Sequence, residues 1–188
     1  MRKIVTAVSI LVGIANWAPN AAAQHVVSHE VVVKLIIKGS EVVGCGIEYV
    51  AAFRDHTYRG GRLSGISGSV SLIDPKDGRT PGMMFKLLGV DFQGTDAGKL
   101  QPFQIVHANV MIDRSVVGKG QPIECENPLG RCSIHQGDDW IKIVERIAKS
   151  SKLTVSFSRS ATGLAVVVEL PTDQEALESL LGCMQQLQ

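Results

Sequence analysis

Apolar and polar residues alternate through the first half of this chain, between His25 and about Ile112, with Gly, Pro and Asp at the breaks. A period of two is typical of β-strands that bury one face and expose the other. The first two alternating segments are 31–37 and 43–53, and Gly39-Ser40 suits a tight turn between them. Further segments of this kind span 66–72, 83–92 and 103–112. The pattern predicts a series of antiparallel strands joined by short turns.

The periodicity changes in the last third of the chain. Apolar residues recur at three- and four-residue spacing from Trp140 to Ile147, and either Asp138 or Asp139 suits the N-cap of a helix. We therefore expect a helix of about twelve residues here. Two alternating segments follow, at 153–157 and 166–170, and they predict two further strands.

A second helix is predicted at the C-terminal end. Thr172 and Glu175 form a capping box, in which the hydroxyl and the carboxylate each bind an otherwise free backbone amide. The apolar stripe behind this box consists of Ala176, Leu180, Cys183, Met184 and Leu187. This order of elements predicts an α+β fold. We expect a mainly antiparallel β core of about seven or eight strands, a single sheet or sandwich-like, with two C-terminal helices packed on it.

The first 23 residues have the three parts of a secretory signal peptide. A basic start precedes an apolar run at 4–15, and Ala21–Ala23 offers a small-residue cleavage site. We expect a signal peptide at 1–23 and a single domain at 24–188, which is long enough to bury a core. The mature chain is therefore predicted to be periplasmic or secreted.

The charge balance restricts the possible partners. The full chain carries a net charge of +1, and loss of Arg2 and Lys3 with the signal peptide takes this value to −1. A nucleic-acid or polybasic membrane binder needs clustered positive charge, so both classes are disfavoured. Beyond the signal peptide no apolar run approaches the roughly 20 residues that span a bilayer. We expect no nucleic-acid partner and no membrane span in the mature chain.

An exported chain meets an oxidising compartment, so its four cysteines are predicted to form disulfides. Cys125 and Cys132 enclose a short segment whose Pro and Gly allow the chain to fold back, which favours a local bridge. By elimination, Cys45 on an apolar strand face joins Cys183 on the apolar face of the last helix. The chain-entropy model gives about 2.5 kcal/mol for the short loop and about 5 kcal/mol for the long one.

Segment 54–62 is the most polar loop of the chain. Five of its side chains are candidates to hold a carboxylate or a phosphate, and these are Arg54, His56, Tyr58, Arg59 and Arg62. The alternative is a solvated hairpin connection with Gly60-Gly61 at its turn. Asp55 and His56 do not make a catalytic pair in a strand, because neighbouring side chains point to opposite faces.

No catalytic residue is assigned. Ser67 lies in an alternating strand, not in the strand-to-helix turn that a nucleophile elbow requires. His107 shares a predicted strand face with Phe103, where we expect it to be partly buried and hydrogen bonded. A zinc site at Cys125, Cys132 and His135 is the alternative to disulfides, but zinc sites usually have closer cysteine pairs. The sequence therefore predicts no metal and no cofactor.

The C-terminal part carries a C-x6-C loop from Cys125 to Cys132, a helix at Trp140, and a strand ending in Leu170-Pro171 before the last helix. In this element order it resembles the invasion-associated locus B family over roughly the last sixty residues. The N-terminal half departs from that family's usual pattern. The resemblance implies an exported, disulfide-bearing, β-rich bacterial protein with a binding or envelope role, and it supplies no catalytic residues.

Export, disulfides and a packed domain without an assembled catalytic set favour a non-enzymatic binding or interaction module of the cell envelope. Its expected partner is an envelope or extracellular protein or an anionic ligand. The alternative is an envelope hydrolase that acts on an anionic substrate. In that case His56 or His107 would be the base, and the arginine-rich loop would hold the substrate.

Overall fold

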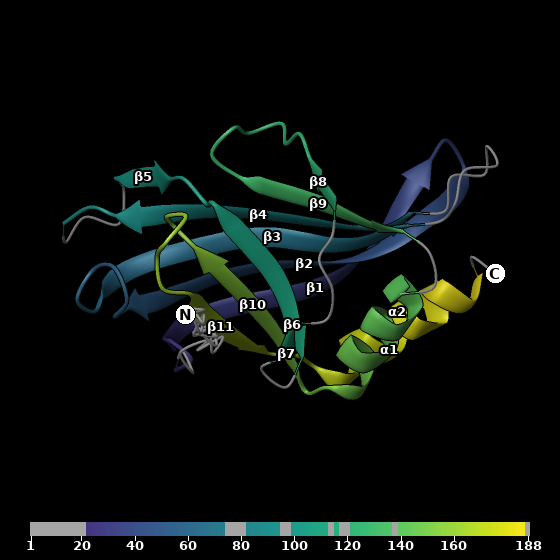
Figure 1. The fold of residues 1–188 in the computed structure, drawn as a ribbon. Helices are drawn as coiled ribbons and strands as arrows, with labels where there is room; N and C mark the ends of the chain where they lie inside the picture. Colours follow the sequence, from purple (N-terminus) through teal and green to yellow (C-terminus); the bar gives the residue numbers. More distant parts are fainter. Residues whose placement is uncertain are drawn as a thin grey trace, which may run out of the picture.

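The computed structural model describes residues 22–73, 82–94, 99–112, 115–116, 121–136 and 139–186. These residues form two antiparallel sheets and two helices (Figure 1). The observed fold is therefore α+β with a mainly antiparallel core, as the periodicity predicts. The predicted signal peptide up to residue 21, the Asp-, Pro- and Gly-containing break at 74–78 between the predicted strands 66–72 and 83–92, and the candidate N-cap Asp138 lie outside the described residues.

The first sheet has seven strands in the order β1-β2-β3-β4-β9-β8, with β5 also paired to β4. The predicted turn at Gly39-Ser40 joins the first two strands, and Gly39 has the positive φ, 66°, that such a turn requires. The strands are β1 (His25–Lys38), β2 (Glu41–Asp55), β3 (Arg62–Ile73), β4 (Gly82–Phe92), β5 (Leu100–Phe103), β8 (Gln121–Ile123) and β9 (Arg131–Gln136).

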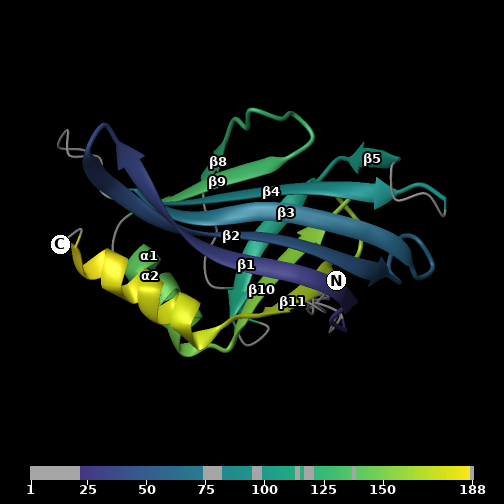
Figure 2. The ribbon, with the colours of Figure 1, turned by 180° about the vertical axis from the view of Figure 1, so that it is seen from behind.

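The second sheet has four strands in the order β11-β10-β6-β7. Figures 1 and 2 show it lying obliquely across one face of the long strands β1 to β4, so the two sheets form the layers of a sandwich. The rings of Phe53 and Phe157, one from each sheet, meet edge to face with centroids 6.3 Å apart. The strands are β6 (His107–Ile112), β7 (Ser115–Val116), β10 (Lys152–Ser158) and β11 (Val166–Pro171).

The described residues contain eleven strands, so the expected seven or eight is too few. Four strands are not among the predicted segments. β5, β7 and β8 have four, two and three residues, which is too short to leave a periodic pattern, and no predicted segment covers β9, which has six residues. The single strand expected at 103–112 is also wrong, because β5 ends at Phe103 and β6 begins at His107. Ile105 between them is buried and continues the alternation while the chain crosses from the first sheet to the second.

Both helices lie at one end of the sandwich (Figure 1). They are α1 (Asp139–Lys149) and α2 (Gln174–Gln186), and they contact each other. Their buried residues recur every three or four positions, which is the spacing of one helix face. These residues are Ile143 and Ile147 on α1 and Leu177, Leu180 and Cys183 on α2.

The start of α2 differs from the predicted capping box. The Asp173 carboxylate, rather than the Thr172 hydroxyl, accepts the backbone N–H of the first turn, from Glu175 at 3.1 Å. Thr172 Oγ1 instead donates to the Ser150 carbonyl at 3.5 Å. Asp is as good an N-cap as Thr, and the connection from β11 places Asp173 at the position before the helix.

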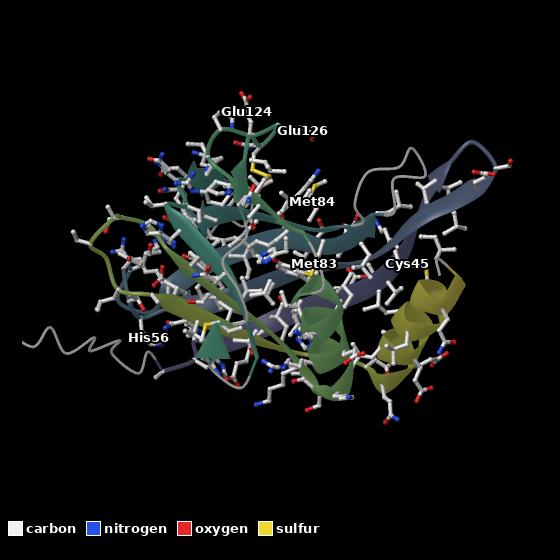
Figure 3. The ribbon with its side chains drawn as sticks, turned by 45° about the vertical axis from the view of Figure 1, so that its right-hand side comes forward. Cys45, His56, Met83, Met84, Glu124 and Glu126 are labelled. Carbon is white, nitrogen blue, oxygen red and sulfur yellow. A yellow bond between two sulfur atoms is a disulfide. The ribbon has the colours of Figure 1, made fainter. Side chains whose placement is uncertain are left out.

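The cysteines form the two disulfides that the sequence favours. Cys45 is bonded to Cys183 with a Cα–Cα distance of 6.1 Å, which ties α2 to β2. Figure 3 shows Cys45 beside this helix. Cys125 is bonded to Cys132 with a Cα–Cα distance of 5.4 Å, which closes the loop between β8 and β9.

Candidate functional site

The outward face of β3 carries only small residues over most of its length. The alternate residues of this strand, such as Ile66 and Val70, are buried in the core. The residues between them therefore point away from the core, and these include Gly65, Ser67, Ser69 and Ser71. Their partners on β4 are larger, because Gly65 lies opposite Val90 and Ser67 lies opposite Leu88. Small side chains between larger ones leave a depression in the sheet surface.

This depression is a groove with a volume of about 570 Å³, which we call the outer groove. Cavities of this size with a mostly apolar lining are typical of small-molecule sites. Val50 and Leu100 remain 55% and 53% exposed, so part of the apolar lining faces solvent. The apolar side chains that line the outer groove are Val50, Ala52, Leu88, Val90, Phe92 and Leu100.

Polar groups lie along the side of the outer groove that β1 forms. Ser28, His29 and Glu30 line it there. Arg54 follows Ala52 on the same face of β2 and is exposed. The Arg54 Nη1 donates to the Gly61 carbonyl at 3.4 Å, which is a long hydrogen bond. The site therefore combines an apolar surface with the Arg54 cation, which follows Ala52 on the same face of β2.

The predicted anion-binding segment 54–62 runs from the end of β2 to the start of β3, and two of its five candidate side chains bind protein groups outside the segment. The Arg59 guanidinium donates to the carbonyls of Leu63 and Phe92 and lies 3.5 Å from an Asp91 carboxylate oxygen. The Tyr58 hydroxyl donates to the Leu164 carbonyl at 2.5 Å. These two side chains hold the loop against the sandwich.

The other three candidates, Arg54, His56 and Arg62, are exposed. The His56 ring packs over Gly61, because a Cβ at that glycine would lie 2.9 Å from the ring carbon Cε1. Figure 3 shows His56 at the end of the molecule remote from α2. The structure therefore does not bring all five side chains to one point, and anion binding by this loop stays a prediction.

Sequence reasoning missed a buried charge cluster beneath this loop, which consists of Asp55, Ser64, Asp91 and Arg159. Arg159 follows β10 in the second sheet, and its guanidinium donates to Asp55 at 2.6 Å, to Asp91 at 3.0 Å and to Ser64 at 3.1 Å. Asp55 is fully buried. The guanidinium also lies 3.5 Å from the centroid of the Phe103 ring, a cation–π contact.

This charge cluster joins the two sheets at the end of the sandwich away from the helices. The Asp55 carboxylate also accepts the backbone N–H groups of Thr57 and Tyr58, at 3.0 and 2.8 Å. Two acids and two arginines, counting Arg59, leave the cluster without net charge. Arg159 Nε is buried without a hydrogen-bond partner, but the two Nη groups of Arg159 bind the two carboxylates and the Ser64 hydroxyl, so the cluster has the arrangement of a structural lock between the layers.

His107 is exposed on β6, so the expectation of a partly buried histidine is wrong. The break between β5 and β6 moves it off the face on which Phe103 lies. Cys125 and Cys132 are bonded to each other, which leaves neither thiol as a metal ligand. In the part of the chain that the structure describes, no group of His, Cys, Asp and Glu side chains is arranged to hold a metal ion.

No family model, curated protein or solved structure matches this chain. The resemblance of the C-terminal part to the invasion-associated locus B family therefore stays a prediction. Neither of the two helices within the described ranges is long and apolar enough to cross a membrane.

Proposed function

We propose that this protein is a non-enzymatic binding module that acts outside the cytoplasm and takes an apolar ligand with an anionic group into the outer groove. The observation that carries the proposal is the apolar surface left exposed on the first sheet, where Val50 and Leu100 are more than half exposed. A folded chain gains free energy by removing such surface from water when a ligand covers it.

The anionic part of the proposed ligand follows from Arg54. Its guanidinium is exposed and next to Ala52 on the face that forms the outer groove. Guanidinium offers paired donors to a carboxylate or a phosphate. A ligand whose apolar body covers Leu88 and Val90 can therefore place an anionic end toward Arg54.

Two features support a periplasmic or secreted location. The signal-peptide pattern at 1–23 predicts export. All four cysteines are paired, and disulfides persist in oxidising compartments. Both features are compatible with a binding protein of the cell envelope.

The test uses anilinonaphthalene sulfonate, a dye with an apolar body and an anionic group, and dodecanoate as its competitor. We expect the dye to fluoresce on binding and dodecanoate to displace it. Val50→Asp should lower the affinity for the dye at least about tenfold, because a carboxylate would be desolvated against the dye and would repel it. Arg54→Gln should weaken binding by a smaller factor through loss of one charge.

The matched control is Leu164→Asp. Leu164 is 58% exposed, like Val50, but it does not line the outer groove. This variant should bind the dye as the unaltered protein does. Equal dye binding by the Val50→Asp variant, or equal losses in both variants, would contradict the outer groove as the site.

No observation in the structure favours the hydrolase alternative. His56 and His107 are exposed, and neither lines the outer groove. Turnover of an ester or glycan that is abolished by His56→Ala or His107→Ala would count against the binding module.

A further inference from the structure

The outer edge of β1 is a second surface built for association. β1 is the terminal strand of the first sheet, and within the described ranges no strand pairs with its outer edge. Apart from β2, it has its main contacts with α2 and β11, neither of which forms a ladder with it. An edge strand presents a row of unpaired N–H and C=O groups, which is a template for another strand.

The middle of β1 has neither a proline nor a β-bulge to block pairing along such an edge. The whole strand is 14 residues long and contains no proline. Val27, Leu35 and Ile37 on it are 51%, 52% and 61% exposed. Its pairing with β2 is irregular at Val26/Ser28 and at Ile36/Ile37 only, so the segment Ser28–Ile36 between these positions is regular. Val32 is the centre of this segment.

The regular segment is complementary to itself. If two copies of β1 pair antiparallel about a twofold axis at Val32, Glu30 of each copy lies opposite Lys34 of the other. Opposite charges placed directly across an antiparallel pair are stabilising. Moving the axis by one residue, to Val31 or Val33, removes this match and places Lys34 opposite Ser28 or Val32. The charge pattern therefore selects one register.

We propose that two copies of this chain associate through their β1 edges, with the twofold axis at Val32, and so join their first sheets into one continuous sheet. Such an interface uses the same patch on both copies and closes on itself as a dimer. Lys34 already contacts Glu48 of its own chain and is 57% exposed in its side chain. The ammonium group has three donors, so it can bind Glu48 and Glu30 of the second copy together.

The proposed dimer also places residues of the second copy beside the outer groove. Ser28 and Glu30 line the groove from β1. In the proposed register, Ile36 and Lys34 of the second copy lie opposite these two residues, so the second copy extends the wall of the groove. The dimer does not depend on ligand binding, and the two proposals can fail separately.

Cysteine cross-linking tests the register. Directly opposite residues in an antiparallel pair have Cα atoms about 4.5–5.5 Å apart, which a disulfide can bridge. The native cysteines are all paired, so an added one is the only free thiol. Val32→Cys should give a covalent dimer on mild oxidation, because Val32 lies opposite itself. Val33→Cys is the matched control, since it lies opposite Val31 and should link poorly.

Mixing two different cysteine variants tests the same register at the proposed Glu30–Lys34 pair. Glu30→Cys and Lys34→Cys should each remain monomeric in non-reducing gels when oxidised alone and form a dimer when mixed. Peptide mapping checks that the native disulfides are kept. Cross-linking of Val33→Cys as fast as Val32→Cys would overturn the register. Absence of cross-links in all of these variants would overturn the interface.

Charge reversal gives an independent measurement by sedimentation. Glu30→Lys creates two repulsive pairs per dimer and should raise the dissociation constant at least about tenfold. The double variant Glu30→Lys with Lys34→Glu restores opposite charges across the axis and should recover most of the affinity. Failure of the double variant to recover, or a native protein that stays monomeric at every concentration, would refute the proposal.

Discussion

Arg159→Met should remove a large part of the stability of this domain. The Arg159 guanidinium makes three hydrogen bonds, to Asp55, Asp91 and Ser64, and its side chain is 12% exposed. Methionine keeps a side chain of similar length against Phe103 but leaves the fully buried Asp55 carboxylate without its cation. Breaking a buried pair in this way costs about 3–5 kcal/mol, because one charge stays desolvated and uncompensated.

The lower end of this range applies here, because Asp55 keeps the backbone N–H groups of Thr57 and Tyr58 and Asp91 is 18% exposed. A loss of about 3 kcal/mol is a large fraction of the free energy of unfolding of a domain of this kind, which is about 5–15 kcal/mol. It should lower the melting temperature by about 6–12 °C. Urea unfolding followed by circular dichroism measures the free energy directly.

The matched control is Arg54→Met, which removes an exposed arginine with one long hydrogen bond and should change the free energy of unfolding by less than about 0.5 kcal/mol. Adding Asp55→Asn to the Arg159→Met variant should recover part of the loss, since it removes the uncompensated charge. A loss below about 1 kcal/mol in Arg159→Met would refute the account of the cluster as a lock between the sheets.

Three further predictions test other parts of the structure. Replacing Cys45 and Cys183 by alanine should lower the melting temperature more than replacing Cys125 and Cys132. The first bridge spans 138 residues and stabilises by about 5 kcal/mol through restriction of the unfolded chain, whereas the second spans 7 residues and stabilises by about 2.5 kcal/mol. Calorimetry of the two double variants measures this order, and the reverse order would contradict the prediction. Gly68→Ala should destabilise by about 1–3 kcal/mol, because its Cβ would lie 2.5 Å from the Tyr49 hydroxyl and collide with the Lys86 carbonyl. A Cβ at Gly182 on α2 would have no atom within 4 Å, so Gly182→Ala should instead stabilise the domain by about 0.5–1 kcal/mol. Denaturant midpoints of the two variants show whether each change stabilises or destabilises the fold. Burial raises the pKa of the Tyr49 phenol, so only the unfolded chain ionises it readily. The free energy of unfolding should therefore fall as pH rises above about 10. Tyr49→Phe should flatten this decline of the unfolding midpoint with pH, and an unchanged slope would contradict the prediction.

Local patterns were sufficient to predict most of the fold. The period of two between positions 31 and 72 identifies the three long strands β1, β2 and β3, because alternation follows from a sheet with one buried face. The turn at Gly39-Ser40 follows from the freedom of glycine at positive φ. The pairing of Cys45 with Cys183 also agrees with the sequence, since both lie on apolar faces that the core brings together.

The candidate sites depend on contacts that no local pattern contains. Arg159 meets Asp55 and Asp91 across 104 and 68 residues of sequence, so only the packing of one sheet on the other brings the charge cluster together. The serines of β3 predict a solvent-facing strand surface, but the outer groove exists because the pairing register sets Leu88 opposite Ser67. Periodicity determines which face of a strand is buried, whereas register and the crossing of the sheets determine which side chains become neighbours.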